Sequence, residues 1–569
     1  MNFNRYFTNQ ELESILKEWA ARYPGLVDLS VIGTSHEGKP IYLMAITNFS
    51  TGSDHEKPAI WLDGNIHATE LAGTTTVLYL VYSVLSQYQK DEQITHLLDT
   101  CTIYAVPRIN PDGAAAAMDT CPRFVRSGVR AYPWTEPDDG LHVQDIDGDS
   151  RILQMRFPDP NGDWKPAPGN SRFMIKRQPA DTGGTYYRVL PEGLLEDYDG
   201  YVIKIAKPQA GLDFNRNFPY EWRTEDEQTG AGPYPASEPE INAVVSFIQA
   251  HKNINIALTF HTYSRALLRP YSTRPDDQMD PHDLRVFKQL GEIGTEITGY
   301  PNVSTFHDFL ESPKDITTGA FDDWLYDHFG AYVFTVELWD LPTEAGIKDR
   351  KLIEWFTRHP VEDDLKIFEW VENNVGPDGY VEWYPFDHPQ LGKVELGGWN
   401  TLYTWRNPPN ECMGKEAERH LPYILTLGKL LPSLSLHTLK ASRTGEKSWT
   451  IDLVVENTGY LPAFTSNQAK KRKVIRPVLA ELKLPPGSRI IVGKPRAEIG
   501  YLQGRSHKSD ISSVFADDAT DNRGHIQWVI EAPEGSEIEV AVTSERAGSF
   551  RRTLKLGQDC PAGDNPKRG

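Results

Sequence analysis

Three short apolar runs, each leading into polar residues, constrain most strongly how this chain can fold. Residues 59–62 run into a turn before His67, residues 254–260 end at His261, and residues 332–336 end at Glu337. Continuous apolar runs of about four to eight residues are typical of strands that are buried on both faces. In open sheets of parallel strands, the carboxyl ends of the strands meet at the edge where ligands bind. His67, His261 and Glu337 are therefore expected to lie close together.

Helical patterns separate these runs. Thr8 and Glu11 form a capping box before an apolar stripe with helical spacing, and Ser237 and Glu240 are predicted to form a second one. Strands that alternate with helices indicate an α/β fold with a mixed, largely parallel twisted sheet flanked by helices.

Changes in composition divide the chain. Residues 1–432 are predicted to form the α/β domain, with an insertion at about 132–208 that is rich in Pro, Gly and Asp and is expected to consist of hairpins and loops. Residues 433–556 carry alternating or β-branched runs between turn residues, which predicts an all-β sandwich. The polar tail, residues 557–569, is predicted to be disordered.

Composition also limits the partners. The four cysteines, at positions 101, 121, 412 and 560, form no CxxC pair, so a bound metal is expected to use nitrogen and oxygen ligands. The net charge of −20 argues against nucleic acid and anionic membranes as partners. No apolar run reaches the roughly 18 to 20 residues that span a bilayer. A cytoplasmic location is expected because no secretory signal is visible, or secretion if a leader has been removed. The oligomeric state is left open.

A metal site is predicted where the first apolar run turns into a helix. His67 and Glu70 are three residues apart in a turn that follows Gly64 and Asn65. Zinc accepts imidazole and carboxylate ligands, and a catalytic zinc keeps three protein ligands plus a water. A single His-x-x-Glu is weak evidence, but His261 offers a third ligand at the same edge of the sheet. An ionised Glu337 buried there would need a partner, which favours a catalytic or metal-linked role over packing.

Seven motifs stand in the order that they have in one known family: Gly33-Thr-Ser-His-Glu-Gly-Lys-Pro-Ile41, His67-x-x-Glu70, Asn110-Pro-Asp-Gly113, Asp213-Phe-Asn-Arg-Asn217, Ser237-Glu-Pro-Glu240, His261-Thr-Tyr-Ser264 and Phe334-Thr-Val-Glu337-Leu. From about residue 5 to residue 340 the sequence resembles the carboxypeptidase A family of zinc metallopeptidases. The resemblance implies a metallocarboxypeptidase with one zinc ion per chain, whose substrates are the C-termini of peptides or proteins.

The resemblance also implies the roles of the metal-site residues. His67, Glu70 and His261 would bind zinc, and Asp213 would orient His67 through its second ring nitrogen. Glu337 would be the general base that takes a proton from water and passes it to the leaving amine.

Further roles concern the substrate. An Arg after the Asn110 motif would stabilise the oxyanion; Arg126 is the candidate, with Arg123 and Arg130 as alternatives. Asn215 and Arg216 would bind the terminal carboxylate of the substrate, for which a bidentate guanidinium is suited.

The sequence departs from the family pattern at two positions. Thr69 stands where many relatives have Arg, and Asp315 falls where the family has a mobile Tyr over the substrate. The resemblance implies that Asp322 lies at the floor of the specificity pocket, as in relatives that prefer C-terminal Lys or Arg. Alternatively, Asp322 stabilises the start of the helix that contains Trp324.

The insertion suggests calcium as a second ion. Alternating acidic residues near Gly148 resemble a calcium loop, but the Gly and the terminal Glu of an EF-hand are missing, so an acidic hairpin tip is the alternative. The acidic and amide residues concerned are Asp145, Asp147, Asp149, Asp159, Asn161 and Asp163.

The sequence leaves two rival functions to consider. One is a zinc amidohydrolase or cell-wall peptide hydrolase of the same fold, against which the Asn215-Arg216 pair argues. The other is a non-catalytic peptide-binding protein, which has no need of Glu337.

Overall fold

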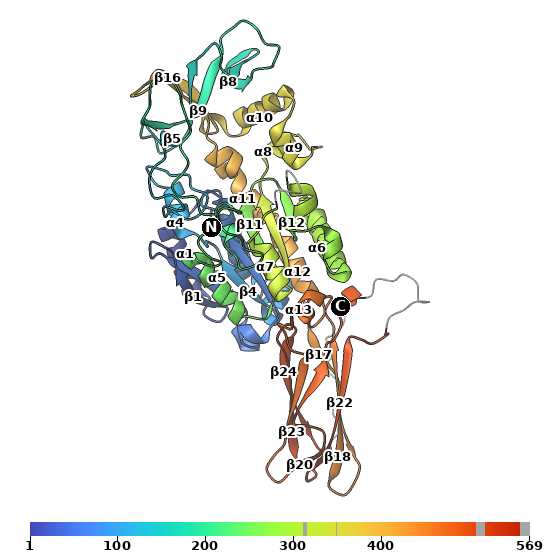
Figure 1. The fold of residues 1–569 in the computed structure, drawn as a ribbon. Helices are drawn as coiled ribbons and strands as arrows, with labels where there is room; N and C mark the ends of the chain where they lie inside the picture. Colours follow the sequence, from blue (N-terminus) through green and yellow to red (C-terminus); the bar gives the residue numbers. More distant parts are fainter. Residues whose placement is uncertain (311–315, 349, 508–517, 558–569) are drawn as a thin grey trace.

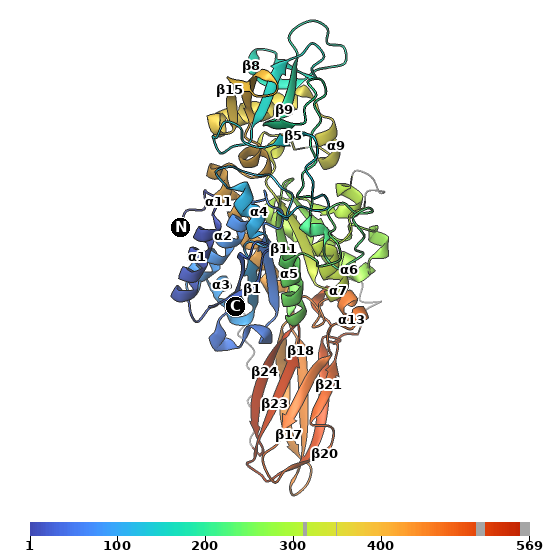
Figure 2. The ribbon, with the colours of Figure 1, turned by 60° about the vertical axis from the view of Figure 1, so that its left-hand side comes forward.

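The chain folds into three parts arranged in a row (Figure 1). The computed structural model describes residues 1–310, 316–348, 350–507 and 518–557. A central α/β body lies between a distal lobe, built from residues 140–196 and 352–399, and a C-terminal β region, residues 434–555 (Figures 1 and 2).

The central body is built on one sheet of eight strands in the order β1-β2-β4-β3-β11-β14-β12-β13. Four neighbouring pairs are parallel, namely β4–β3, β3–β11, β11–β14 and β12–β13, and the other three are antiparallel. The predicted mixed, largely parallel sheet is therefore confirmed. The strands are β1 (Val27–Thr34), β2 (Pro40–Ile46), β3 (Ala59–Gly64), β4 (Thr102–Val106), β11 (Ile254–Thr262), β12 (Ala266–Arg269), β13 (Asn302–Ser304) and β14 (Tyr332–Leu338).

Every residue of β3, β4, β11 and β14 is buried, because helices cover both faces of the sheet (Figure 2). The helices of the body are α1 (Asn9–Arg22), α2 (Ala72–Gln87), α3 (Glu92–Thr100), α4 (Pro111–Ala117), α5 (Pro239–Ala250), α6 (Pro281–Thr298), α7 (Phe321–Phe329), α8 (Leu341–Glu344), α11 (Asn410–Glu418) and α12 (Leu421–Leu430).

One predicted capping box is present and the other is wrong. Thr8 and Glu11 cap α1 reciprocally, as expected. At α5 the N-cap is Glu238, and no side chain caps the helix. The hydroxyl of Ser237 donates to Glu238 instead, and the buried Glu240 carboxylate accepts from the backbone N–H of His36 at 2.9 Å. These contacts with other parts of the chain replace the local cap.

The distal lobe combines the predicted insertion with a later segment of the chain. Its main sheet has the order β15-β16-β6-β9-β7-β8, and β5 pairs separately with β10. Phe173 of β8 stacks on Phe368 of α10 with ring centroids 4.5 Å apart, so the insertion shares a core with the later segment. The elements are β5 (Gly140–Val143), β6 (Gln154–Pro158), β7 (Trp164–Ala167), β8 (Asn170–Lys176), β9 (Tyr187–Pro191), β10 (Gly193–Glu196), α9 (Leu352–Thr357), α10 (Val361–Asn374), β15 (Tyr380–His388) and β16 (Gly392–Trp399).

The C-terminal β region holds two four-stranded sheets, β17-β18-β22-β20 and β21-β19-β23-β24. Buried and half-buried residues alternate along β18, as expected for a strand with one face in a core. The prediction of an all-β fold is confirmed; the exact domain limits stay predictions, and residues 558–569 of the predicted tail lie outside the described residues. The elements are β17 (Leu434–Arg443), β18 (Ser448–Asn457), α13 (Asn467–Arg472), β19 (Val478–Lys483), β20 (Arg489–Val492), β21 (Arg496–Gly500), β22 (Arg523–Glu531), β23 (Glu537–Ser544) and β24 (Gly548–Lys555).

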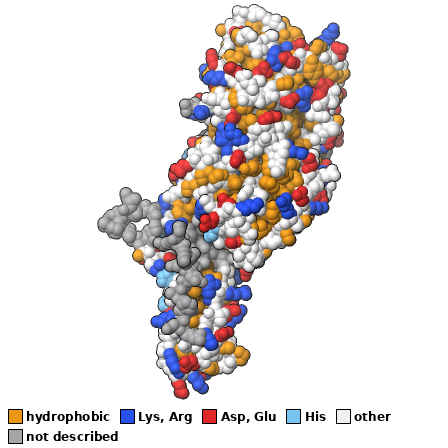
Figure 3. Space-filling model, turned by 180° about the vertical axis from the view of Figure 1, so that it is seen from behind, with side chains coloured by type: hydrophobic (Ala, Val, Ile, Leu, Met, Phe, Trp, Pro, Cys, Tyr) orange, Lys and Arg blue, Asp and Glu red, His pale blue; other side chains and the backbone are white. Residues whose placement is uncertain are grey.

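The distribution of surface charge and the character of the helices relate to the predictions about nucleic-acid and membrane partners. In the view from behind, Lys and Arg side chains are scattered among Asp and Glu (Figure 3). In the described ranges, none of the helices combines the length and the apolar character that crossing a bilayer requires.

Arg546 fastens the C-terminal β region to the central body. It lies between β23 and β24, is only 1% exposed, and its guanidinium donates to the carbonyl oxygens of Ile254 and, at 2.8 Å, of Phe329. The carbonyl of Arg546 accepts from Asn255 at 2.9 Å. Burial lowers the pKa of Arg546 to about 10, so the guanidinium stays charged at neutral pH.

Replacing this arginine should loosen the contact between the two parts. Arg546→Met keeps the length of the side chain but leaves two buried carbonyl oxygens without their donor, a loss of about 2–4 kcal/mol. We expect the thermal unfolding midpoint, measured by scanning fluorimetry, to fall by at least about 3 °C. Arg551→Met, at an exposed position of β24, is the control and should leave the midpoint unchanged. Equal midpoints for both variants would contradict the role of Arg546.

Candidate active site

The turn after β3 is held in an unusual shape that directs His67 and Glu70 inward. Asn65 has a positive φ of 57°, and its side-chain amide donates to the carbonyl of His67 at 2.7 Å. Gly64 packs so closely on α2 that a Cβ atom there would lie 2.6 Å from the backbone of Gly73. Glycine is therefore required at position 64.

Asn110 holds the neighbouring loop against this turn. Its side-chain amide donates to the carbonyls of Ile66 and Ser127, at 3.2 and 2.8 Å, and the backbone N–H of Ala68 donates to the carbonyl of Arg126 at 2.9 Å. The loop that carries Arg126 is thus fixed relative to His67.

The three predicted zinc ligands converge. His67 Nδ1 lies 2.9 Å from Glu70 Oε1, His261 Nδ1 lies 3.1 Å from Glu70 Oε2, and the two Nδ1 atoms are 3.1 Å apart. All three side chains are at most 3% exposed. Ligand atoms at 2.0–2.2 Å from a tetrahedral zinc would be about 3.3–3.6 Å apart, so the group needs only a small expansion. Two imidazoles and one carboxylate are also the donor set of a catalytic zinc with an open position.

Asp213 contacts the other nitrogen of His67, as predicted. His67 Nε2 and Asp213 Oδ1 are 3.2 Å apart, which leaves Nδ1 as the metal-facing atom. Burial opposes ionisation of Asp213, but Arg126, Arg216 and His67 together hold the pKa of this carboxyl well below its usual range.

Of the three candidate arginines, Arg126 is the one that reaches the centre. Its Nε donates to Asp213 Oδ2 at 2.9 Å, and Nη1 lies 3.3 Å from Glu70 Oε1. The side chain is still 42% exposed, so donors remain for a ligand. Arg130 is engaged elsewhere in a bidentate pair with Glu238, at 2.7 and 3.0 Å.

Glu337 lies beside His261 because their strands are parallel and in register. The two residues are direct partners in the β11–β14 ladder. The pKa of Glu337 is raised to about 7, mainly by burial and also by the nearby Glu70, although His261, Arg126 and Arg406 favour the charged form. A carboxylate with a pKa near neutrality is suited to accept and return a proton.

The predicted anchor for the substrate follows Asp213 in a short 3-10 helix, Phe214–Arg216. Asn215 Oδ1 accepts from the N–H of Phe321 at 2.8 Å, and Arg216 Nη1 donates to the carbonyl of Asn215 at 2.8 Å. The first bond holds the Asn215 side chain at the start of α7, and the second holds the Arg216 guanidinium against the preceding residue.

Asp322 is buried at the start of α7. Its Oδ2 accepts from the Thr335 hydroxyl at 3.3 Å, and Oδ1 accepts from the N–H of Asp323 at 3.0 Å. Thr335 and Glu337 are two residues apart in β14, so their side chains share one face of the sheet. The Asp322 carboxylate therefore contacts the face that carries Glu337, and it also bonds an N–H in the first turn of α7. Burial raises its pKa.

Sequence reasoning missed a cavity beside the metal ligands. It measures about 220 Å³, and both Arg126 and Arg406 line it; the Arg406 guanidinium stacks on Tyr263 at 5.1 Å. Arg406 belongs to the segment that returns from the distal lobe, and no motif marks it. Asn407 anchors this segment by donating to the carbonyl of Thr69 at 2.7 Å. The cavity is lined by Thr69, Phe124, Val125, Arg126, Thr401, Leu402 and Arg406.

Two further predictions concern the substrate cap at Asp315 and calcium in the insertion. Asp315, the position of the missing Tyr, lies outside the described residues. In the insertion, Asp145 and Asp147 meet the buried Glu192. Asp145 accepts from Gly148 and Ser150 N–H groups at 2.7 and 2.8 Å, so a cation is not needed to satisfy it. Asp159 lies in a different turn, where its Oδ1 accepts from the backbone N–H of Asn161 at 2.7 Å. Calcium is not supported.

Comparison with known proteins decides the family. A family model described as "Zinc carboxypeptidase" matches residues 12–355, which is more than half of the chain. The chain belongs to the zinc carboxypeptidase family. A second model, described as a domain of unknown function, matches residues 433–555.

Curated relatives of this zinc carboxypeptidase family member match a similar share of the chain. Carboxypeptidase A2 of Rattus norvegicus is 28% identical over 345 residues, 60% of this chain and 64% of the relative. Carboxypeptidase B of Homo sapiens is 25% identical over 352 residues, again 60% of this chain and 64% of the relative. The chain thus spans less than two thirds of the length of these relatives.

Solved structures that match this chain include that of thrombin activatable fibrinolysis inhibitor, with 19% identity, a TM-score of 0.43 and coverage of 75% of this chain and 74% of that one. Carboxypeptidase A from Helicoverpa armigera has 17% identity, a TM-score of 0.39 and coverage of 65% and 73%. The family is zinc-dependent, and the His67, Glu70 and His261 group is its candidate metal site here. The individual residue roles stay predictions.

Removing the carboxylate behind His67 should weaken metal binding. Asp213→Asn keeps the shape of the side chain but replaces the charged carboxylate that accepts a hydrogen bond from His67 with a neutral amide. Changes of this kind weaken metal affinity about 10- to 100-fold. Competition with a zinc chelator measures the affinity. Asp226→Asn, at an exposed position nearby in sequence, is the control. If Asp213→Asn and the control bind zinc equally well, Asp213 does not orient a ligand.

Proposed function

We propose that this protein is a zinc-dependent metallocarboxypeptidase that hydrolyses the C-terminal peptide bond of peptides or proteins. The observation that carries the proposal is the position of Glu337, a buried carboxylate in register with His261 and beside a group of three metal-binding side chains. Membership of the zinc carboxypeptidase family supports the same reaction.

The zinc ligands, Glu337 and Arg126 have separate roles in the proposed hydrolysis. Zinc held by His67, Glu70 and His261 would supply Lewis acidity, which polarises the scissile carbonyl and makes water a better nucleophile. Glu337 accepts the proton of the attacking water and returns it to the leaving amine. Arg126, whose guanidinium is partly exposed beside Glu70, donates to the oxygen that becomes negative.

A terminal carboxylate is the feature that defines the substrate. Arg216 is held in place through its bond to the Asn215 carbonyl and lies 3.9 Å from Asp213 Oδ2. A guanidinium paired this loosely can bind an incoming carboxylate. This anchor favours an exopeptidase over an amidohydrolase, and the base Glu337 favours an enzyme over a non-catalytic binding protein.

The proposed function is tested by removing the base. Glu337→Gln keeps the size of the side chain but cannot take a proton, and we expect kcat to fall about 10²- to 10⁴-fold. Release of single amino acids from a panel of peptides, followed by mass spectrometry, measures the activity. Glu362→Gln, at an exposed glutamate, is the matched control, and peptides with an amidated C-terminus should resist the wild-type enzyme. Full activity of Glu337→Gln with unchanged zinc content would contradict the proposal.

Side-chain preference is a finer proposal that rests on Asp322. Its buried carboxylate accepts two hydrogen bonds from neutral groups, and no ion pair to it is found across the described part of the chain. A substrate Lys or Arg would provide the missing cation. Losing one partner of a buried charge pair costs about 2–5 kcal/mol, so Asp322→Leu should lower kcat/KM for C-terminal Lys at least about 30-fold.

The control for this prediction is the substrate itself. Peptides that end in Leu should be cleaved no worse by Asp322→Leu than by the wild type, because they have no charge to pair. A wild-type enzyme that prefers C-terminal Leu to C-terminal Lys would show that Asp322 does not select the C-terminal side chain of the substrate.

Arg406 is proposed to contact the part of the substrate upstream of the cut. If Arg216 binds the terminal residue, the rest of the peptide leaves on the other side of the metal ligands, toward the cavity beside Thr69. The Arg406 guanidinium stacks on Tyr263, and within the described ranges no carboxylate pairs with it.

We therefore expect Arg406→Gln to lower kcat/KM about tenfold for peptides with Glu two residues before the end, a loss of about 1.4 kcal/mol. For peptides with Ala at that position the loss should be smaller, because only the effect of the Arg406 charge on the pKa of Glu337 remains. An equal effect on both peptides would mean that Arg406 does not contact the Glu side chain of the substrate.

A further inference from the structure

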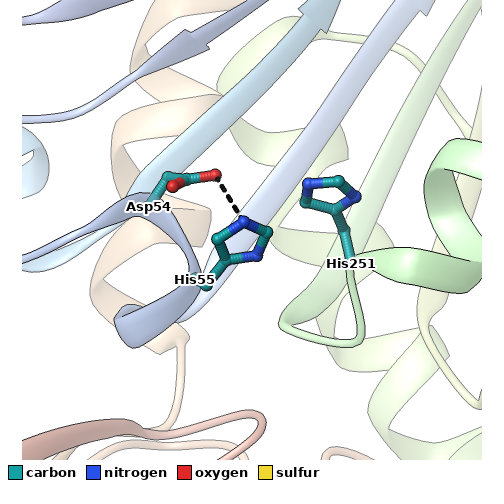
Figure 4. A group of neighbouring side chains, drawn as sticks. All are labelled: Asp54, His55 and His251. Carbon is teal, nitrogen blue, oxygen red and sulfur yellow. Dashed lines mark ion pairs between the residues drawn. The ribbon is translucent and has the colours of Figure 1, made fainter. Parts of the chain in front are cut away.

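A second group of potential metal ligands lies at the opposite edge of the central sheet. Asp54 and His55 belong to a 3-10 turn, η2 (Asp54–Glu56), just before β3 begins, and His251 follows the end of α5 (Figure 4). The active site follows the other end of β3, so the two groups are separated by the length of that strand. This inference is independent of the proposed function.

His251 presents one nitrogen for binding. Its Nδ1 lies 2.7 Å from the carbonyl oxygen of Phe247, and because a carbonyl only accepts, Nδ1 carries the hydrogen and Nε2 carries a lone pair. The ring is stacked on Phe247 at 3.7 Å and meets the edge of Tyr104 at 5.1 Å, which fixes its direction. Burial lowers the pKa of His251, so the ring is neutral at pH 7. Ligating histidines commonly have their second N–H bonded in this way.

Asp54 is fixed as well. Its Oδ2 accepts from the Tyr104 hydroxyl at 2.9 Å. The backbone carbonyl of Asp54 accepts from the side chains of Thr102 and Asn253, at 3.0 and 2.9 Å. The turn and its carboxylate are therefore held in place by the adjoining strands.

His55 completes the group and can move. Its Nε2 is 3.7 Å from Asp54 Oδ2, and its ring stacks on His251 at 4.6 Å. The side chain is 58% exposed, so a small rotation that brings the ring plane toward an ion costs little packing. One donor atom from each of the three residues lies within 4.8 Å of the others, around the common space in Figure 4.

The neighbouring cation does not fill this space. Lys57 directs its ammonium to the Thr47 and Thr51 hydroxyls and to the Asn48 carbonyl, at 2.7–2.8 Å. Its hydrogen bonds are therefore made to these oxygens and not to the three donors, although its charge still interacts with Asp54.

We propose that Asp54, His55 and His251 form a second site for a divalent transition-metal ion, of which zinc is the representative. Two imidazoles with one carboxylate suit zinc, nickel or copper, whereas calcium and magnesium require mostly oxygen ligands. The donors are farther apart than those of the active site and one is exposed, so this site binds more weakly and exchanges readily with solvent.

An ion here would link separate parts of the fold. It would join the η2 turn to the end of α5, and η2 also packs against β24 of the C-terminal β region, where Gly548 approaches Glu56. Binding would therefore stabilise the contact between that region and the central body.

The test counts zinc ions bound per chain in the full-length protein. Zinc is added to the wild type in isothermal titration, and bound metal is measured by mass spectrometry after equilibrium dialysis at the same free zinc. We expect His55→Ala and Asp54→Asn each to bind one zinc fewer than the wild type, with affinity for that ion at least tenfold weaker. His96→Ala, which removes an exposed histidine from α3, is the matched control and should equal the wild type.

The difference between variants is independent of the active site, because both variants leave His67, Glu70 and His261 intact. Zinc should also raise the thermal midpoint of the wild type and of His96→Ala but raise it less in His55→Ala. Equal zinc counts and equal affinities for His55→Ala and the wild type would overturn the proposal.

Discussion

Buried negative charge at one edge of the central sheet is the constraint on which the active site depends. Glu70, Asp213 and Glu337 are each less than 9% exposed and lie near one another. Ionised carboxylates in such a place need cationic partners. Asp213 has two, since Arg126 bonds it and Arg216 is close by, whereas Glu70 shares Arg126 with Asp213 and otherwise faces two imidazoles. A metal ion between His67, Glu70 and His261 would supply the missing charge, and it would also draw Glu337 toward its ionised form.

The fold fixes this arrangement through elements that the sequence makes visible. Parallel strands bring their carboxyl ends to one edge, so His261 and Glu337 could be placed together from their positions at the ends of two apolar runs. The order of the seven motifs added the roles of Asp213 and Arg126. The structure gives a physical reason for the Asn110 motif, because Asn110 joins the loops of His67 and Arg126. Outside the motifs, Gly64 allows β3 to approach α2.

Features that depend on contacts between distant segments could not be predicted in this way. The insertion looked like isolated hairpins, but its sheet is completed by β15 and β16, about 200 residues later, and pairing at that distance leaves no local pattern. Arg406 and the His55–His251 pair were missed for the same reason. Ser237 had the pattern of a helix cap, yet its hydroxyl bonds Asn217 and Glu238. In the C-terminal β region, the sequence did not indicate the strands β17, β21 and β24, which complete the two sheets.

The central claim is that the buried carboxylate Glu70 and its two histidines form a zinc site. Anomalous diffraction at the zinc absorption edge, from crystals of the wild-type protein grown with zinc, tests it directly. The account predicts a strong peak about 2.0–2.2 Å from the Nδ1 atoms of His67 and His261 and from the Glu70 carboxylate. A map without a peak among these three side chains, with the protein otherwise well ordered, would contradict it.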